Sequence, residues 1–524
     1  MDGSTETEIA TIALGEAALR LHPADDVAVA KAPLFAGQTL VEGDLRITVC
    51  QPQMTLGGRP IPTGHKVALR EIAAGAPVHR YGQVIGFATR TIAPGEHVHV
   101  HNVGILGPEE EGLERETVFG VDVRPAVPAP ADEQRTFMGY RRADGRVGTR
   151  NTIAVISTVN CSAHAAREIA RHFTPERLAA FPCVDGVVAL THTLGCPMRY
   201  TLLRRTLAGM ARHPNVGGFV LVGLGCETNQ AADLMTEYGL SGPALVIQEL
   251  GGLRRTVQAG IEAVEALLPQ VNEVARTPQP ASALTVALQC GGSDSWSGVT
   301  ANPVVGLVSD EIVRQGGAVV LTETPEIYGA EHLLTRRAVS REIGAELLAQ
   351  VRWWEAYARR MGFDLDQNRS VGNQAGGLTT IYEKSLGAVI KAGSTPLTGV
   401  YEYAAPVTTR GLAFMNSPGY DPVAVTGQVA GGCTLVLFTT GRGSVLGFEL
   451  APTIKIATTT ALYARMADDM DLDAGRVLAG EPPAAVADEL FELLLAVASG
   501  QPSKSEAQGV GEAEFVPWDV EGTL

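Results

Sequence analysis

A short run of histidines near residue 100 has the residue type and spacing of a metal site. His97, His99 and His101 alternate with valines. In a β-strand, residues two apart share a face, so the three imidazoles would line one side of a strand over 97–101. Imidazole is a common ligand of borderline metals. The solvated polar face of an edge strand is the structural alternative for this pattern.

Four cysteines have a common local context that could also carry chemistry. Each follows a predicted strand and has glycine, serine or asparagine next to it, and they are Cys161, Cys196, Cys226 and Cys290. Four thiols at the same end of one sheet would converge, and such a group could bind a metal ion or a metal cluster. No C-x-x-C pair indicates a zinc or iron–sulfur site, however. We interpret the four thiols as the lining of a substrate pocket with one or two reactive members, against the alternative of small buried filler residues.

The segment Leu288–Pro303 is rich in glycine and hydroxyl side chains. It follows a predicted strand at 283–288 and leads into a predicted helix at 304–315, which is where open parallel sheets bind ligands. Small residues allow a close backbone approach, and the hydroxyls and amides could bind an anion. The segment also contains a thiol at Cys290, a carboxylate at Asp294 and an amide at Asn302, and Ser293 is one of its hydroxyl residues. A tight loop without chemistry is the alternative.

Other strand ends supply candidates for acid–base chemistry and for binding a carboxylate. The acid–base candidates are His192, Glu227, Asp294, Glu323, Glu383 and Lys384, and the candidate carboxylate-binding cations are Arg442 and Lys455. An ion pair or a capping contact is the structural alternative for each of them. The glycine-rich pieces lack the Walker spacing, the third dinucleotide glycine and a G-x-S-x-G elbow, so nucleotide binding and serine hydrolysis are not indicated.

Length, composition and charge limit the class of protein. With 524 residues, roughly three domains are expected. The net charge of −16 argues against nucleic acid or an anionic membrane as the main partner. Seven scattered cysteines do not form a disulfide framework, and neither a signal peptide nor a membrane-spanning run is evident. We expect a cytoplasmic protein with reduced thiols.

The elements that would position these residues divide the chain into five parts. Short β-prone pieces between glycines predict a small β domain at 10–103. An acidic and then proline-containing linker spans 104–135. Alternating strands and helices predict two α/β domains with parallel, Rossmann-like sheets at 136–278 and 279–500, followed by a tail at 501–524. The predicted fold class is therefore α/β, with a separate N-terminal β domain.

Several motifs resemble one known family across nearly the whole chain. The segments that carry the resemblance are 21–25 (LHPAD), 64–69 (GHKVAL), 81–86 (YGQVIG), 139–145 (GYRRADG), 223–227 (GLGCE), 289–294 (QCGGSD), 297–303 (SGVTANP), 383–387 (EKSLG) and 439–443 (TTGRG). Together they resemble the altronate and galactarate dehydratase family of sugar-acid dehydratases. The first three resemble that family's β-clip (SAF-type) domain, and the histidine run is more like the altronate branch.

The resemblance implies a lyase that converts a sugar acid into a 2-keto-3-deoxy acid. Removing the proton at C2 creates a dianionic enediolate, and a divalent metal on the carboxylate would neutralise that charge. The resemblance implies Fe²⁺ or Mn²⁺. We place the metal between the β domain and the first sheet, with His22 and His65 as leading ligands and the His97/His99/His101 face as second choice.

The remaining roles are assigned as hypotheses. The base, the acid and the substrate contacts are expected from His192, Cys226, Glu227, Cys290 and Asp294. Substrate binding is expected from Ser293, Asn302, Lys384 and Arg442. The expected partners are a small anionic sugar acid and a second copy of the chain in a homodimer, with no nucleic acid and no membrane.

Two departures from the family pattern concern the substrate. Gln374 stands where the family pattern has a lysine, and Val445 and Leu446 replace a Pro-Tyr pair. A related branch eliminates sulfite from the smaller hydroxy acid sulfolactate, which is the alternative reaction. The alternative from another class is a sugar-acid-binding homologue that has lost activity.

Overall fold

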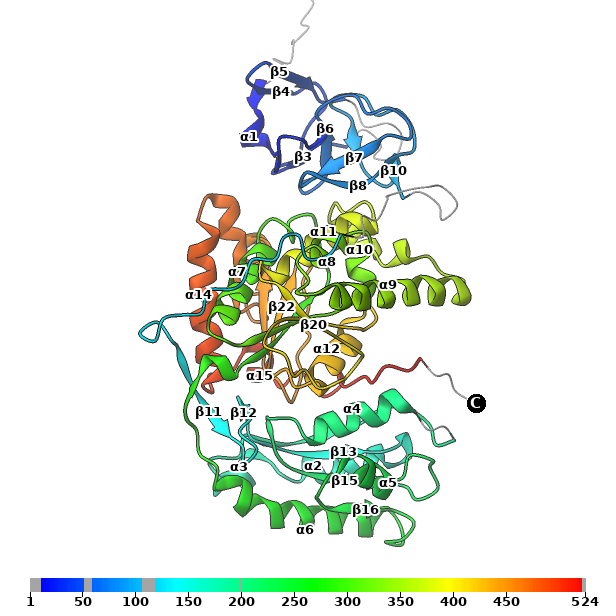
Figure 1. Cartoon of the computed structure of the whole chain (residues 1–524), viewed down its shortest axis with the longest axis vertical. Coiled ribbons are helices and arrows are strands. Elements are labelled where there is room, and N and C mark those ends of the chain that lie inside the picture. Colours follow the sequence, from blue (N-terminus) through cyan, green and yellow to red (C-terminus); the bar gives the residue numbers. More distant parts are fainter. Residues whose placement is uncertain (1–10, 51–58, 106–117, 198–199, 521–524) are drawn as a thin grey trace, which may run out of the picture.

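The computed structural model describes residues 11–50, 59–105, 118–197 and 200–520. Figure 1 shows three units along the long axis: the N-terminal β domain, a large α/β unit in the middle and a smaller α/β unit at the far end. Chain order and spatial order therefore differ. The smaller unit comes second in sequence, but the β domain packs on the large unit that follows it.

The N-terminal domain consists of short strands around one apolar cluster of its own, and its other buried side chains belong to the core cluster that continues into the large unit. Glycines close its turns; a side chain at Gly95 would lie 2.0 Å from the carbonyl oxygen of Thr48, so only glycine fits there. Its elements are β1 (Thr11–Ala13), α1 (Leu14–Ala17), β2 (Ala18–Leu19), β3 (Val27–Ala30), β4 (Thr39–Glu42), β5 (Leu45–Thr48), β6 (Lys66–Ala68), β7 (Pro77–Arg80), β8 (Gln83–Ala88), β9 (His97–Val98) and β10 (Val103–Gly104).

The smaller α/β unit has a parallel four-stranded sheet in the order β14-β13-β15-β16. Helices α2 and α6 cover one face and α4 and α5 the other, because each presents an apolar stripe to the sheet. Its elements are β11 (Thr136–Arg141), β12 (Val147–Gly148), β13 (Thr152–Ser157), α2 (Ala163–Arg171), α3 (Pro175–Leu178), β14 (Gly186–Leu190), α4 (Thr201–Ala211), β15 (Val216–Gly223), α5 (Ala231–Tyr238), β16 (Ala244–Val246), α6 (Leu253–Asn272) and β17 (Thr277–Pro280).

The large unit is built on a parallel seven-stranded sheet in the order β20-β21-β19-β18-β22-β23-β24. Its central strands are buried on both faces, as expected for a parallel sheet covered by helices. Its elements are β18 (Thr285–Cys290), α7 (Ala301–Arg314), β19 (Ala318–Leu321), α8 (His332–Thr335), α9 (Arg341–Met361), α10 (Val371–Ala375), α11 (Ile381–Val389), β20 (Leu397–Tyr401), β21 (Gly411–Met415), α12 (Asp421–Ala430), β22 (Leu435–Thr440), β23 (Thr453–Ala457), α13 (Thr460–Arg465), β24 (Leu472–Asp473), α14 (Pro483–Ala498) and α15 (Lys504–Ala507).

Two predicted elements are shorter than the sequence pattern suggested. The helical pattern over 330–360 is broken before Ser340, whose side chain caps the new helix α9 by accepting a hydrogen bond from the amide of Ile343. The predicted strand over 97–101 ends at Val98, and a turn follows in which Asn102 accepts a hydrogen bond from the amide of His99. The three histidines are therefore not on one strand face.

The linker and the tail both lie against the large unit. In the described part of the linker, Gly120 and Asp122 donate backbone hydrogen bonds to the α8 end, and Asp122 pairs with Arg336 at 2.6 Å. In the tail, Trp518 is buried and stacks on Trp354 of α9, with ring centroids 5.4 Å apart. Among the described helices, none combines the length and the apolar character needed to cross a bilayer.

Candidate functional site

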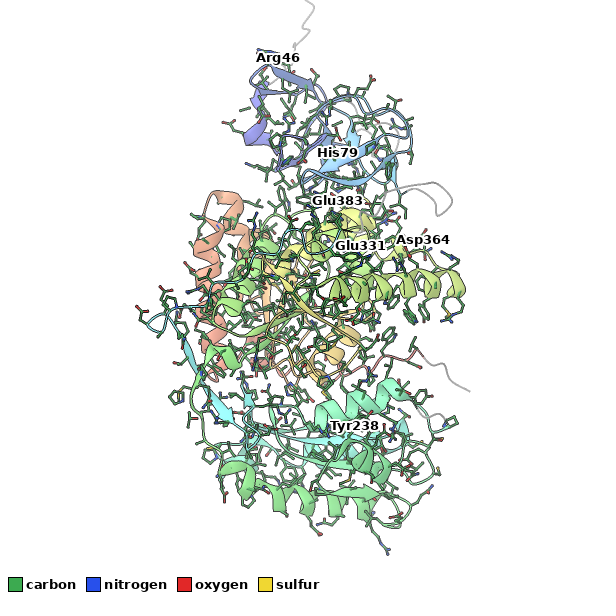
Figure 2. All side chains as sticks on the ribbon, in the orientation of Figure 1. Arg46, His79, Tyr238, Glu331, Asp364 and Glu383 are labelled. Carbon is green, nitrogen blue, oxygen red and sulfur yellow. The ribbon has the colours of Figure 1, made fainter. Side chains whose placement is uncertain are left out.

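The junction of the β domain and the large unit is held by a buried cluster of charges. Lys66, on β6, places its ammonium 2.9 and 3.0 Å from the two carboxylate oxygens of Glu383 on α11. Arg80, at the end of β7, donates to the same carboxylate at 2.5 Å and to the carbonyl oxygen of Ser295 at 2.7 Å. All three side chains are almost completely buried. Glu383 lies where the two units meet in Figure 2.

The electrostatics of this cluster favour a charged Glu383. Burial by itself would raise its pKa, but Lys66 and Arg80 outweigh burial and hold the pKa of Glu383 at about 2. Thr379 adds hydrogen bonds from its amide and its hydroxyl, at 2.7 and 2.6 Å. Burial lowers the pKa of Lys66 to about 8, with Glu383 opposing the shift. Two cations and one carboxylate leave a net positive charge at the junction.

Three histidines meet beside this charge cluster. The side-chain nitrogens of His65, His97 and His99 that could bind an ion all lie within 4.8 Å of one another. His65 Nδ1 is 3.0 Å from His97 Nε2, and His65 Nε2 is 3.3 Å from the carbonyl oxygen of Ala375 in the large unit. The His101 ring also contacts His97, at 5.2 Å between centroids. The group therefore lies at the junction with the large unit, not with the first sheet as we expected.

Burial keeps these imidazoles neutral, which is the form that binds metals. It lowers the pKa of His65 to about 4, of His97 to about 2 and of His99 to about 3. Within the described residues, the Nδ1 atoms of His97 and His99 are buried and have no hydrogen-bond partner. His22 is not part of this group. Its Nδ1 accepts from the amide of Ala24, 3.1 Å away.

A second buried group lies on the large unit, at the carboxyl ends of β18 and β19. Ligand atoms of Cys290, Glu323 and Glu326 lie within 4.8 Å of one another. Lys391 contacts the Cys290 sulfur at 2.6 Å, and Lys384 contacts Glu326 at 2.7 Å. Two lysines already neutralise much of the negative charge, so this group is better described as an acid–base network than as a second metal site.

Two carboxyl groups in this network have strongly raised pKa values. Glu323 is held with φ +69°, a left-handed conformation, and its buried oxygens have no hydrogen-bond partner in the described part of the chain. Burial, Glu326 and Asp421 raise its pKa well above the usual value. Burial and Glu326 raise the pKa of Asp421 to about 7. Gly291 makes room for Asp421, because a side chain there would lie 2.3 Å from its carboxylate.

Helix α11 connects the two groups. Glu383 faces the β domain, and the next residue, Lys384, faces Glu326 and also donates to Asn368. Thr380 caps the helix by accepting from the amide of Glu383. The adjacent positions Glu383 and Lys384 therefore couple the histidine group to the carboxyl network.

The predicted residues of the β18–α7 loop have different positions. Asp294 is buried and holds the loop: it accepts from the amides of Trp296 and Ser297 and from the hydroxyls of Ser297 and Thr458. Asn302 is also committed, to the carbonyl oxygen of Gly387 and the hydroxyl of Thr439. These contacts support a structural role for both residues.

Two other predicted substrate contacts retain free polar groups. The Ser293 hydroxyl is buried and has no partner in the described part of the chain. Arg442 is exposed, and its backbone amide donates to the carbonyl oxygen of Gly292 at 2.9 Å, which brings the β22 loop against the β18 loop. Lys455, by contrast, is buried and donates to Ser505.

Cys290 does not share a sheet with the other three cysteines, so the predicted convergence of all four is wrong. Cys290 ends β18 of the large unit, whereas Cys161, Cys196 and Cys226 follow β13, β14 and β15 of the smaller unit. His192 and Glu227 lie in the same loops of the smaller unit, after β14 and β15. In Figure 1 the large unit separates this sheet from the β domain.

Several residues of the junction were missed from sequence. Lys66 and Arg80 look like ordinary strand lysine and arginine, and Asp421 looks like a first-turn helix residue. Lys391 follows α11 and carries no motif of its own. A signal was present for Lys66, because a fully polar residue stands in the apolar strand β6 between His65 and Val67.

The architecture and the site define a class of enzyme: a parallel α/β body whose buried acid–base network is closed by a β domain carrying histidines. Family profiles match over three ranges. They are described as the altronate/galactarate dehydratase SAF domain (16–105), the second domain of D-galactarate dehydratase/altronate hydrolase (139–272) and the C-terminal domain of D-galactarate/altronate dehydratase (281–523).

Full-length relatives agree with the profiles. Altronate dehydratase of Escherichia coli is 36% identical over 93% of this chain and 96% of its own length. Galactarate dehydratase (L-threo-forming) of the same organism is 39% identical over 84% of this chain and 86% of its own. The (2R)-sulfolactate sulfo-lyase subunit beta of Chromohalobacter salexigens is 33% identical over 73% and 97%. The chain belongs to the altronate/galactarate dehydratase family and is an enzyme of the hydro-lyase class.

Proposed function

We propose that this enzyme dehydrates a sugar acid of the altronate or galactarate type to a 2-keto-3-deoxy acid, using a divalent metal at the junction of the β domain and the large unit. The observation that carries the proposal is the meeting of three neutral imidazoles, from His65, His97 and His99, beside an acid–base network on the facing unit. The similarity to the two sugar-acid dehydratases supports the substrate class.

The residues fit the metal that the family resemblance implies, Fe²⁺ or Mn²⁺. His97 and His99 each have a buried Nδ1 without a partner in the described residues, and a buried unpaired nitrogen is costly unless something binds it. His65, His97 and His99 would hold the ion. When bound, it would supply Lewis-acid stabilisation of the negative charge that develops on the substrate carboxylate.

Cations of this chain would orient the anionic substrate. Lys66 and Arg80 exceed the charge of Glu383 by one unit, and Arg442 is exposed at the edge of the β18 loop. A net positive site that excludes water attracts a carboxylate more strongly than an exposed cation does. We assign substrate positioning to Arg442 and the Ser293 hydroxyl.

Asp421 and Glu323 would move the protons. With a pKa of about 7, the Asp421 carboxylate is suited to accept the C2 proton. Burial, with Glu326 and Asp421, raises the pKa of Glu323 well above its usual value, so this carboxyl holds its proton more firmly and would donate it to the departing C3 hydroxyl. Lys391 and Lys384 stay charged and stabilise the carboxylate forms: burial opposes their charge, but neighbouring Cys290, Glu323 and Glu326 raise the pKa of both.

The sulfo-lyase reaction is the second candidate, supported by the similarity to the sulfolactate sulfo-lyase subunit and by Gln374, Val445 and Leu446. The test is a screen of aldonic, aldaric and sulfonated hydroxy acids with added Fe²⁺ or Mn²⁺, with 2-keto acid and sulfite as readouts. Keto acid without sulfite from a sugar acid is expected. Sulfite release would favour the second reaction, and binding without turnover would favour a non-catalytic homologue.

A further inference from the structure

Three cysteines of the smaller α/β unit occupy equivalent positions on neighbouring strands. Cys161 follows β13, Cys196 follows β14 and Cys226 follows β15. The three strands are hydrogen-bonded neighbours in parallel orientation, with β13 between the other two. Their carboxyl ends therefore share one edge of the sheet. We infer that these three thiols hold an iron–sulfur cluster with one iron left open to an oxygen ligand.

Hydrogen bonds join the three loops close to each cysteine. The amide of Thr228 donates to the carbonyl oxygen of Cys196 at 2.8 Å, two residues from Cys226. The amide and side chain of Asn160, next to Cys161, donate to the carbonyl oxygens of Leu194 and His192 at 3.0 and 3.1 Å. The backbones that carry the thiols are therefore held together before any ligand binds, which lowers the entropic cost of binding one.

Two ionisable groups of these loops, Glu227 and His192, are already hydrogen-bonded. Both oxygens of Glu227 accept hydrogen bonds, from the Thr158 hydroxyl at 2.8 Å and from the amides of Leu224 and Gly225 at 3.1 and 2.7 Å. Both ring nitrogens of the buried His192 are occupied, by the carbonyl oxygen of Ser157 and the amide of Leu194. These hydrogen bonds help to hold the loops in place, and the acid–base roles of Glu227 and His192 stay predictions.

The three thiols differ from Glu227 and His192 in their exposure and in their hydrogen bonding. Cys161 and Cys226 are exposed and Cys196 is partly exposed, and within the described residues no hydrogen bond involves their sulfur atoms. Cys50 and Cys290 differ, since the sulfur of each has hydrogen-bond partners. A filler cysteine is buried in apolar surroundings, and these three are not.

The chemistry of the donor set favours a cluster over a single ion. The three sulfurs are not among the groups whose ligand atoms lie within 4.8 Å of one another, as one ion would require. A cluster has several irons between its ligands, so it suits thiols that are further apart, and thiolates are its usual ligands. Assembly needs iron and sulfide from outside, and each of the three thiols gives up one proton on binding.

A three-thiol site leaves one iron without a protein ligand, because clusters of this kind are ordinarily held by four cysteines. That iron would take an oxygen donor, and a 2-hydroxy carboxylate supplies two. The cluster would then be a second binding site for this class of acid, apart from the junction at which the proposed function places the reaction. The binding of a 2-hydroxy carboxylate to the open iron rests on the proposed function, whereas the cluster itself does not. The cluster would also lie apart from the histidine group, because in Figure 1 the large unit separates the smaller α/β unit from the β domain, which carries those histidines.

The test is anaerobic reconstitution of the full-length chain with ferrous iron, sulfide and a thiol reductant, followed by iron and sulfide analysis and electron paramagnetic resonance of the reduced protein. Iron and acid-labile sulfide in equal amounts are expected in the wild type, and their loss in C161S, C196S and C226S. The matched control is C183S, because Cys183 is also partly exposed but precedes β14, at the opposite edge of the same sheet.

Three results would overturn the inference: iron without sulfide, zinc in place of iron, or equal cluster content in the triple serine variant. Circular dichroism of each serine variant shows whether the sheet has folded. Addition of galactarate or sulfolactate to the reduced wild type should change the resonance of the cluster, and an unchanged spectrum would remove the open iron. A cluster that forms in a chain without dehydratase activity would refute the proposed function alone.

Discussion

Lys66 and Glu383 form a fully buried ion pair, 2.9 Å long, between residues 317 positions apart in the chain. Arg80 shares the same carboxylate, so one acidic side chain compensates two cations. Because charges buried without a partner are costly, this contact sets how firmly the β domain and the large unit are joined.

The first prediction concerns that carboxylate. Glu383→Gln leaves Lys66 and Arg80 buried without a counter-charge and should destabilise the protein by about 3–5 kcal/mol. Glu492→Gln is the control, because Glu492 pairs with Arg135 on the surface and both side chains are 42–58% exposed; its cost should stay below about 1 kcal/mol. Urea unfolding measures both. Equal shifts in the two variants would mean that the buried pair has no special weight.

The second prediction separates the two groups of candidate metal ligands. His97→Ala should weaken Mn²⁺ binding by about 10-fold or more, as loss of a ligand or of its supporting group does. His22→Ala should leave the affinity unchanged, because His22 bonds to the amide of Ala24 and lies outside the histidine group. Calorimetric titration of metal-free protein measures both affinities. A loss confined to His22→Ala would restore the ligand set first expected from sequence.

The third prediction distinguishes a base from a loop-holding carboxylate. Asp421→Asn removes the proposed base and should lower kcat by about 10²-fold or more without loss of stability. Asp294→Asn should act on stability instead, by about 1–3 kcal/mol, since the amide nitrogen that replaces Oδ2 cannot accept the hydrogen bond from the Thr458 hydroxyl. Kinetics and thermal unfolding of both variants are the measurements. Wild-type turnover in Asp421→Asn would exclude it as the base.

Local patterns predicted the alternation of strands and helices and the parallel sheets, but not the order of the strands or the partners across the chain. Glycine and hydroxyl residues after β18 correctly indicated a strand-to-helix loop, because tight loops need such residues whatever the tertiary fold. The separation of Cys290 from the other three cysteines could not be foreseen, because β18 and β13 look alike in sequence and only the tertiary fold assigns them to different sheets.

The histidines illustrate the same limit. Alternation over 97–101 predicted one strand face, whereas a turn after Val98 brings His99 back against His65, with ring centroids 4.5 Å apart. The sequence therefore predicted that His97 and His99 would lie close together, but it did so from a strand face that the structure does not have. His65 joins it through the pairing of β6 with β9, a contact between segments about thirty residues apart that periodicity alone does not reveal.

The fourth prediction concerns pH. Burial, with Glu512 and Glu514, raises the pKa of Glu449 from 4.5 to about 7. The folded protein therefore favours the protonated carboxyl, and this stabilisation is full below about pH 4.5 and is lost as the pH rises through about 7. Glu449→Gln, which mimics the protonated form, should raise the melting temperature at pH 8 but not at pH 4.5. Glu273→Gln, at an exposed position after α6, is the control and should show no such difference.

The fifth prediction concerns the division of the site between two parts of the chain. Two separate subunits of the sulfolactate sulfo-lyase match this single chain, the beta subunit over 73% of it and the alpha subunit over 8%. The linker after residue 117 belongs with the body, because Gly120, Asp122 and Ala129 bond to the large unit. Residues 118–524 alone should therefore fold but not turn over substrate, since the histidines would be missing.

Adding residues 1–105 in trans should restore part of the activity, because His65, His97 and His99 would again face the carboxyl network across the junction. The same fragment carrying Lys66→Met is the control, and it should rescue less, because it leaves Glu383 with one cation in place of two. Keto acid formation at increasing fragment concentration measures the rescue. Full activity of residues 118–524 without any added fragment would contradict the shared site and assign catalysis to the α/β units alone.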